Sequence, residues 1–188
     1  MGRELEYKYT GTETAFAVLQ QRFGPFTETK METTYYDTPD AALSKRRWTL
    51  RRRMENDISV CTLKVPLPDG SRGEWEAEAA SIEEGMEKLC RCGAPEQLRE
   101  VTDLHPVCGA RFTRLAAMIS LTDAKVELAL DRGVLLGAGK EQPLLEVEVE
   151  YKAGSEAVVH AFAQALAREF HLTEEPLSKF ARARRLCL

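Results

Sequence analysis

The chain has 188 residues, of which 26 are Lys or Arg and 30 are Asp or Glu, so its formal net charge is −4. This mild acidity argues against a general binder of nucleic acid or of anionic membranes. Hydrophobic residues make up 44% of the sequence, enough for one well-formed core at this length. We expect a single domain over residues 1–188, because no internal repeat or low-complexity linker divides the sequence.

The sequence gives no sign of a membrane segment or of a thiolate metal site. No apolar run approaches the roughly 18 residues of a membrane-spanning helix, and charge at Arg3 and Glu4 replaces the apolar stretch of a secretory signal. The five cysteines and three histidines show no zinc-ligand spacing. The expectation is a soluble cytoplasmic protein with a small-molecule partner, no nucleic acid and no membrane; a homodimer stays an open alternative.

Four segments carry apolar residues at helical spacing, and we expect helices at residues 14–23, 81–92, 95–100 and 155–170. Ser81 and Ser155 are candidate N-caps, and Ser81 with Glu84 fits a capping box. The helices are amphipathic, so each needs an apolar surface to cover.

Six other segments alternate with period two, so each predicts a strand with one apolar and one charged face. The charged residues are, in chain order, Glu4, Glu6 and Lys8; Arg47, Arg51 and Arg53; Lys64; Glu74, Glu76 and Glu78; Lys125, Glu127 and Asp131; and Glu146, Glu148 and Glu150. Like charges are grouped within strands, and most of these strands have little Ser, Thr or Gln on the charged face.

Two interpretations of this alternation are open. The commoner one is an antiparallel sheet whose charged face lies in water. The other is a sheet that curls so that the charged faces line its interior, with the helices on the outside. Grouped like charges favour the second, because they would repel one another on a solvated sheet without any gain. Clustered carboxylates and cations in one interior would suit a divalent metal and a polyanion.

Several short motifs follow one another in a specific order. They are Glu4-Leu5-Glu6-Tyr7-Lys8, Tyr35-Tyr36-Asp37-Thr38-Pro39, Leu50-Arg51-Arg52-Arg53, Thr62-Leu63-Lys64, Glu146-Val147-Glu148 and Ser178-Lys179-Phe180. The first resembles the ExExK signature of the CYTH superfamily, the triphosphate tunnel metalloenzymes, and the others resemble that family's later motifs. The resemblance extends from Glu4 to about Arg182.

The resemblance implies an α+β fold in which a closed eight-stranded antiparallel β tunnel has helices packed on its outside. It also implies Mg²⁺ or Mn²⁺ as cofactor. By position in the motifs, the implied catalytic residues are Glu4, Glu6, Lys8, Lys64 and Glu148. The implied substrate-binding residues are Lys8, Arg51, Arg53, Lys64, Arg114 and Lys179, with Arg111 as the alternative to Arg114. The implied metal ligands are Glu4, Glu6, Asp131, Glu146 and Glu148.

The activity that the resemblance favours is metal-dependent hydrolysis of a triphosphate, most simply inorganic tripolyphosphate. The alternatives within the family are a class IV adenylate cyclase and a thiamine or nucleoside triphosphatase. An organic base would need an aromatic platform, but Trp48, Trp75 and Tyr36 are better explained as core residues. From another class, the chain could be a polyphosphate- or nucleotide-binding module that does not turn over. Its many carboxylates argue against that, because anion binding alone would be stronger without them.

Overall fold

The structure is a computed structural model that describes residues 2–188, apart from the side chain of Arg3. The strands are β1 (Gly2–Glu4), β2 (Glu6–Thr10), β3 (Thr27–Asp37), β4 (Thr49–Glu55), β5 (Ile58–Pro66), β6 (Arg72–Glu78), β7 (His105–Leu121), β8 (Ala124–Gly137), β9 (Lys140–Gly154) and β10 (Thr173–Glu174). The helices are α1 (Glu13–Phe23), α2 (Ala42–Lys45), α3 (Ile82–Arg91), the 3₁₀ helix η1 (Glu96–Glu100), α4 (Glu156–Glu169) and α5 (Lys179–Arg185).

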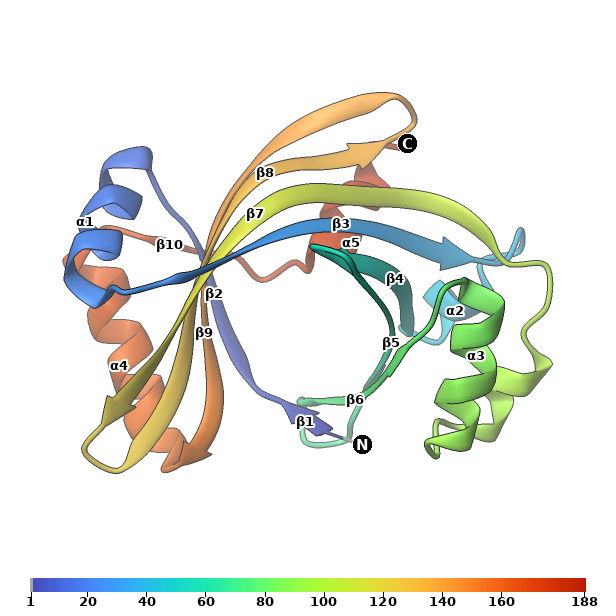
Figure 1. The fold of residues 1–188 in the computed structure, drawn as a ribbon, viewed down its shortest axis with the longest axis horizontal. Coiled ribbons are helices and arrows are strands. Elements are labelled where there is room, and N and C mark those ends of the chain that lie inside the picture. The colour runs from blue at the N-terminus through green and yellow to red at the C-terminus, as the bar shows by residue number, and fades with distance from the viewer. Residues whose placement is uncertain (1) are drawn as a thin grey trace.

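The described strands form one strongly curved antiparallel sheet in the order β1-β6-β5-β4-β3-β7-β8-β9-β2-β10 (Figure 1). The expected closed tunnel of eight strands is therefore wrong in two respects. The sheet has ten strands within residues 2–188, or nine if β1 and β2, which only Leu5 separates, are counted together. Its order is also open, since β1 and β10 are its two ends and no pairing joins them among the described residues.

The N-terminal segment nevertheless reaches both sides of the sheet. β1 pairs with β6, and β2 pairs with β9 directly after Leu5. The backbone N–H of Tyr151 also donates to the carbonyl of Leu5 at 2.9 Å. One short stretch of chain thus spans from β6 to β9, which brings the two sides of the curved sheet together around an interior (Figure 1).

The alternating segments did not include the two long central strands, β3 and β7; β3 does alternate, but its charged residues Glu28, Lys30 and Glu32 lie on the face away from the cavity. The inward positions of β3 are Thr29, Met31, Thr33 and Tyr35, none of which is charged. β3 and β7 pair along their whole facing length, with one register shift between Tyr35 and Tyr36. β3 and β7 form the centre of the sheet and join the two groups of strands that the alternating segments predicted.

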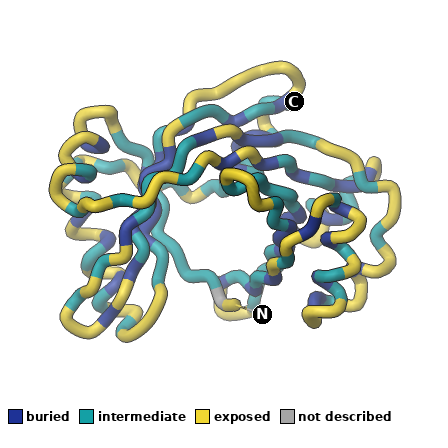
Figure 2. The backbone as a smooth tube through the Cα atoms, in the orientation of Figure 1, coloured by how far each residue is buried: buried dark blue, intermediate teal, exposed yellow. Residues whose placement is uncertain are grey.

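Three apolar clusters hold the helices on the sheet. α1 and α4 pack on β2, β8 and β9, where Phe16, Leu128 and Val149 are almost fully buried. α2, α3 and η1 pack on β4 to β6 around Leu63 and Leu89. The third cluster joins α5 to β3, β7 and β8. Most exposed residues accordingly lie on the outer helices and loops, while the strands are buried or half-buried (Figure 2).

The predicted helix starts agree with the structure to within one or two residues. The Ser81 hydroxyl accepts from the N–H of Glu84 at 3.3 Å, and the Glu84 carboxylate reaches back to the N–H of Ala80 at 2.8 Å, which confirms the capping box in a form shifted by one residue. Ser155 caps α4 as expected. The sequence did not predict α5, the short helix near the C-terminal end. No helix among residues 2–188 is long and apolar enough to cross a membrane.

Candidate functional site

The charged faces of the strands line a cavity of about 380 Å³ inside the curved sheet. Eight acidic and eight basic side chains line it. The acidic ones are Glu4, Glu6, Glu55, Glu74, Glu76, Glu127, Glu148 and Glu150, and the basic ones are Lys8, Arg51, Arg53, Lys64, Arg72, Arg114, Lys152 and Lys179. The charged faces therefore point inward, as the grouping of like charges favoured.

Strand register places opposite charges side by side in this interior. Lys8 on β2 lies opposite Glu148 on β9, Lys64 on β5 lies opposite Glu74 on β6, and Arg114 on β7 lies opposite Asp131 on β8. Such directly opposed pairs have close side chains. The same register also places carboxylates opposite one another, Glu6 and Glu127 both opposite Glu150 and Asp131 opposite Glu146, so acidic groups gather on the β2, β8 and β9 side.

The first side of the cavity, which we call the β4–β6 wall, comprises Arg51, Arg53, Lys64, Glu74 and Glu76. Its ion pairs are long: Arg51 lies 3.9 Å from both Glu74 and Glu76, and Lys64 lies 3.2 Å from Glu74. Burial alone would lower the pKa of Arg51, but nearby Tyr35, Glu74 and Glu76 outweigh it and raise that pKa. Arg51 is thus only loosely held by carboxylates, whereas Arg53 makes a two-pronged contact with Glu55 and Lys64 pairs closely with Glu4.

The N-terminal segment adds two carboxylates between the sides of the cavity. Glu4 pairs with Lys64 of the β4–β6 wall, and Glu6 lies 3.4 Å from Lys8. Burial raises the pKa of Glu6, and the negative charges of Glu148 and Glu4 raise it further. Glu6 is thus a carboxylate whose surroundings hold more negative charge than they neutralise.

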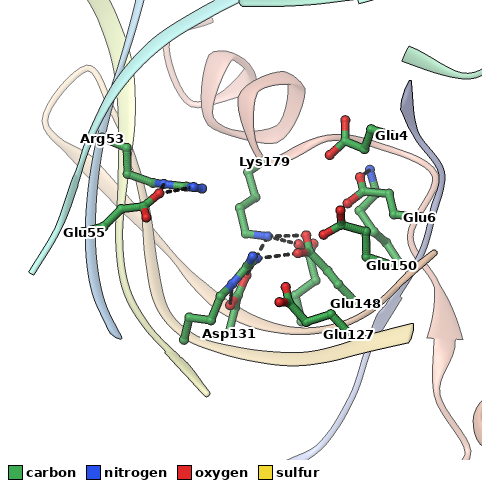
Figure 3. Close-up of polar contacts among 12 residues, drawn as sticks. Glu4, Glu6, Arg53, Glu55, Glu127, Asp131, Glu148, Glu150 and Lys179 are labelled. Carbon is green, nitrogen blue, oxygen red and sulfur yellow. Dashed lines mark hydrogen bonds and ion pairs between the residues drawn. The ribbon is translucent and has the colours of Figure 1, made fainter. Parts of the chain in front are cut away.

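The second side, the β8–β9 wall, comprises Arg114, Asp131, Glu146, Glu148 and Lys179. Arg114 makes a two-pronged contact with Asp131 at 2.7 and 2.8 Å and also contacts Glu148. Lys179 of α5 points into the same group, 2.8 Å from Asp131 and 2.7 Å from Glu148, and also pairs with Glu146 (Figure 3). Asp131 and Glu146 are fully buried, so this wall is a dense internal ion network.

The network sets the protonation of its members. Burial alone would raise the pKa of Glu148, but Lys179 and Arg114 hold it well below its usual value. Burial would lower the pKa of Lys179, but Asp131, Glu148 and Glu146 outweigh it and keep Lys179 charged. Burial raises the pKa of Glu146 to about 7, against the opposing effect of Lys179. A cation and its carboxylates support each other here, which a buried ion group requires.

The structure brings nine of the eleven expected site residues to the cavity surface. They are Glu4, Glu6, Lys8, Arg51, Arg53, Lys64, Arg114, Glu148 and Lys179. The other two, Asp131 and Glu146, lie behind it, where their oxygens contact Arg114, Lys179 and Arg182. The roles assigned to these eleven residues stay predictions. The structure separates the nine at the cavity surface from the two that are buried behind it.

Sequence reasoning missed seven charged residues of the cavity as site residues: Glu55, Arg72, Glu74, Glu76, Glu127, Glu150 and Lys152. Glu74, Glu76, Glu127 and Glu150 were predicted to lie on charged strand faces but were given no role in the site. Glu55, Arg72 and Lys152 continue the period-two pattern, so extending that pattern to the strand ends would have found them. Arg182 was missed for another reason. It lies one helical turn after Lys179 in a helix that the sequence did not predict.

Two carboxylate groups could hold a divalent metal. Asp131, Glu146 and Glu148 offer oxygens within 4.8 Å of one another, but Arg114, Lys179 and Arg182 already neutralise them. At the cavity surface, the carboxylates of Glu6, Glu148, Glu150 and Glu127 gather on one side (Figure 3). Mutual repulsion raises the pKa of Glu6, and burial raises that of Glu150. Hard oxygen donors with surplus negative charge fit Mg²⁺ or Mn²⁺.

Comparison with known protein families gives a match over almost the whole chain. The model of the CYTH domain matches residues 2–183. The chain belongs to the CYTH family. A curated relative, the inorganic triphosphatase of Haemophilus influenzae, is 29% identical over 153 residues, which cover 79% of this chain. The CYTH chain spans only 44% of that relative's length.

Solved structures share the fold. HpAC1 from Hippeastrum, a candidate adenylyl cyclase described as having a dominant triphosphatase activity, has a TM-score of 0.71 at 21% identity, covering 98% of this chain and 97% of its own. A candidate adenylate cyclase from Bacillus halodurans has a TM-score of 0.61 at 22% identity, with 95% and 96% covered. PH1819 from Pyrococcus horikoshii has a TM-score of 0.63 at 21% identity, with 94% and 96% covered. At these identities the likeness concerns the fold.

Proposed function

We propose that the CYTH chain hydrolyses a triphosphate, with inorganic tripolyphosphate as the substrate and Mg²⁺ or Mn²⁺ as the cofactor. The observation that carries this proposal is a cavity lined by eight carboxylates and eight cations, in which Arg51 lies 3.9 Å from its carboxylate neighbours while Glu6, Glu127, Glu148 and Glu150 gather on one side. A binder of anions alone would gain from losing the carboxylates.

The charge balance of the cavity explains why a metal belongs in the proposal. Eight acidic and eight basic side chains leave the lining close to neutral. A bound tripolyphosphate brings about four negative charges near neutral pH. One or two divalent cations would offset that excess and strengthen binding of the anion, which the cavity cations alone would bind more weakly.

The proposed ligands are the cavity-facing carboxylates Glu4, Glu6 and Glu148, with Glu150 beside them. Bound there, the metal would polarise phosphoryl oxygens and neutralise charge on the substrate. Asp131 and Glu146 take a supporting part in this proposal, since Arg114, Lys179 and Arg182 occupy their oxygens. The cations of the β4–β6 wall, with Lys8, Arg114 and Lys179, hold the phosphate oxygens.

We assign proton transfer to Glu6, because its pKa is raised and Lys8 lies 3.4 Å away, whereas Glu150, whose pKa is also raised, is paired with Lys152 at 2.8 Å. Glu148 is held ionised by Lys179 and Arg114, and Glu4 is paired with Lys64. A water attacks the terminal phosphorus in line with the bridging oxygen, and Glu6 accepts the water proton. The bond between phosphorus and the bridging oxygen breaks, and Arg51 or Arg53 stabilises the charge on the departing pyrophosphate. The products are phosphate and pyrophosphate.

The cavity lining favours an inorganic substrate over a nucleotide. Trp48 and Trp75 pack in the apolar cluster under α3, and Tyr36 packs against the same cluster. Three aromatic residues do line the cavity: the Phe112 ring contacts Arg114 and Lys179, and the rings of Tyr35 and Phe180 contact each other with centroids 5.2 Å apart and planes tilted by 48°. The triphosphatase activities of the Haemophilus influenzae and Hippeastrum proteins also support a triphosphatase.

The test is a substrate panel with a matched pair of variants. Phosphate, pyrophosphate and cyclic AMP are measured with tripolyphosphate, thiamine triphosphate and ATP, each with Mg²⁺ and with Mn²⁺. The wild-type protein is expected to cleave tripolyphosphate fastest and only with metal. Glu6→Gln should lower kcat by at least about 100-fold, the usual effect of losing a general base. Glu78→Gln, at the exposed end of β6, should behave as the wild type.

Other outcomes of the panel contradict the proposal in different ways. Cyclic AMP as the only product would favour the cyclase alternative. Tight tripolyphosphate binding with no cleavage of any substrate would favour the binding module. Normal turnover by Glu6→Gln would leave triphosphate hydrolysis standing but remove Glu6 as the proton acceptor.

A further inference from the structure

The proposed function requires Lys179 to bind a phosphate oxygen, but protein carboxylates already surround its ammonium group. Its ammonium has three protons, and three carboxylates contact it: Asp131 at 2.8 Å, Glu148 at 2.7 Å, and Glu146. All of its donors are thus directed at protein carboxylates. To hold a phosphate oxygen, Lys179 must release one of them, and the released carboxylate needs another cation, because a buried unpaired charge is costly.

Arg182 supplies that second cation. It lies one turn after Lys179 on α5 and pairs with the fully buried Glu146 and, at 3.5 Å, with Glu175. Arg182 is itself buried and is absent from the cavity lining, as is Glu146, whereas Lys179 and Glu148 line it. The contacts form a line from Arg182 through Glu146 to Lys179 and then to the cavity.

We propose that Arg182 is a positioning residue for substrate binding: by neutralising Glu146 from behind, it frees the ammonium of Lys179 to bind a phosphate oxygen. This inference rests on the proposed function and deepens it. Asp131 and Glu148 keep Arg114 as their own second cation, so Glu146 is the carboxylate whose release depends on Arg182. Without Arg182, the network of three carboxylates has only two cations, and Lys179 stays with Glu146.

A plain anchoring role for Arg182 would look different. The Glu146 and Glu175 contacts also tie α5 to the sheet, so any loss of Arg182 could loosen the helix. If Arg182 only anchors α5, replacing Glu146 as well would not restore tripolyphosphate binding. If Arg182 frees Lys179, replacing Glu146 would restore binding, because a neutral residue at position 146 no longer competes for the ammonium. A double variant therefore separates the two roles.

The experiment measures tripolyphosphate binding by isothermal titration calorimetry with EDTA present and no metal, at about pH 8.5, where an ordinary carboxyl is ionised. The variants are Arg182→Met, Arg182→Met with Glu146→Gln, and the control Arg185→Met, an exposed residue on the same helix. We expect Kd to rise about tenfold in Arg182→Met, the size of one lost charge-assisted contact. The double variant should return to within about threefold of the wild type, and Arg185→Met should not change.

Wild-type affinity in Arg182→Met, or a double variant as weak as the single one, would overturn the inference. Arg182→Gln is made in parallel as a milder change that keeps hydrogen-bond donors beside Glu146; if Arg182→Met does not fold, the same weakening and the same rescue are required of Arg182→Gln. A wild-type protein that binds tripolyphosphate but cleaves no triphosphate would refute the proposed function alone. Normal cleavage with unaltered affinity in Arg182→Met would refute the inference alone.

Discussion

The β4–β6 wall and the β8–β9 wall come from the same kind of alternating sequence but are built differently. On the β4–β6 wall, Arg51 lies 3.9 Å from its carboxylate neighbours. On the β8–β9 wall, Lys179 lies 2.7 to 2.8 Å from two carboxylates, and Asp131 and Glu146 are fully buried. The difference arises because α5 inserts cations only on the second side. The first wall therefore leaves Arg51 available to a ligand, whereas Arg114 and Lys179 on the second wall are engaged by several carboxylates at once.

The largest effect that would sharpen this comparison is expected at Lys179. Lys179→Met leaves Asp131, Glu146 and Glu148 with too few cations in a buried place. Breaking a buried ion group in this way costs about 3–5 kcal/mol of unfolding free energy. Urea unfolding followed by circular dichroism measures the loss. Lys45→Met, which removes an exposed pair with Asp40, is the control and should leave the urea midpoint unchanged. Equal midpoints for the two variants would show that the β8–β9 wall is not a stabilising network.

The matching change on the other wall should affect binding more than stability. Arg51→Met removes a cation that no close carboxylate holds, so little unfolding free energy depends on it. It should raise the KM for tripolyphosphate about tenfold, as expected for one lost charge-assisted contact. Steady-state kinetics and urea unfolding of the same preparation test both parts. A stability loss as large as that of Lys179→Met would erase the distinction between the walls.

A third expected effect is a dependence of stability on pH. The pKa of Glu146 is raised from 4.5 to about 7 and that of Glu6 is also raised. A raised carboxyl pKa gives stability that is fully present below the unfolded value and is lost as pH rises through the folded value. Unfolding free energy should therefore decline between about pH 4.5 and 7, by at most about 1.4 kcal/mol per pH unit for each group.

Glu146→Gln is the variant that tests this pH dependence. It removes one of the two titrating groups, so its unfolding free energy should decline less over the same pH range. Glu148 acts in the opposite direction, since its pKa is well below the usual value, but its contribution is lost only at lower pH. A decline as steep in Glu146→Gln as in the wild type would show that Glu146 does not titrate in this range.

Local patterns in the sequence predicted much of the fold. Charges at every second position located β2, β4, β6 and the paired parts of β8 and β9, because that spacing is fixed by the geometry of a strand. Ser81 and Ser155 located two helix starts, since a capping hydroxyl is a local requirement. The family resemblance added nine cavity residues that alternation alone would not have separated from a solvated face.

The sequence could not predict features that depend on partners distant along the chain. Asp131 and Glu148 have the same alternating pattern, yet only Glu148 lines the cavity. Their partner Lys179 comes from α5, 31 to 48 positions further along the chain, which local pattern cannot show. The count of eight strands was wrong because the two-residue β10 adds an edge to the sheet and Leu5 divides the N-terminal strand into β1 and β2. A short helix like α5 has too few turns to show a clear apolar period.

The central claim is that tripolyphosphate and its metal lie between the two walls. The most direct measurement is a crystal structure of Glu6→Gln with tripolyphosphate and Mn²⁺, in which slow cleavage preserves the substrate and the anomalous signal locates the metal. We expect phosphate oxygens beside Arg51, Arg53 and Lys179, and Mn²⁺ beside Glu148. Tripolyphosphate bound only on the outer surface, with no Mn²⁺ signal among the cavity carboxylates, would contradict the account.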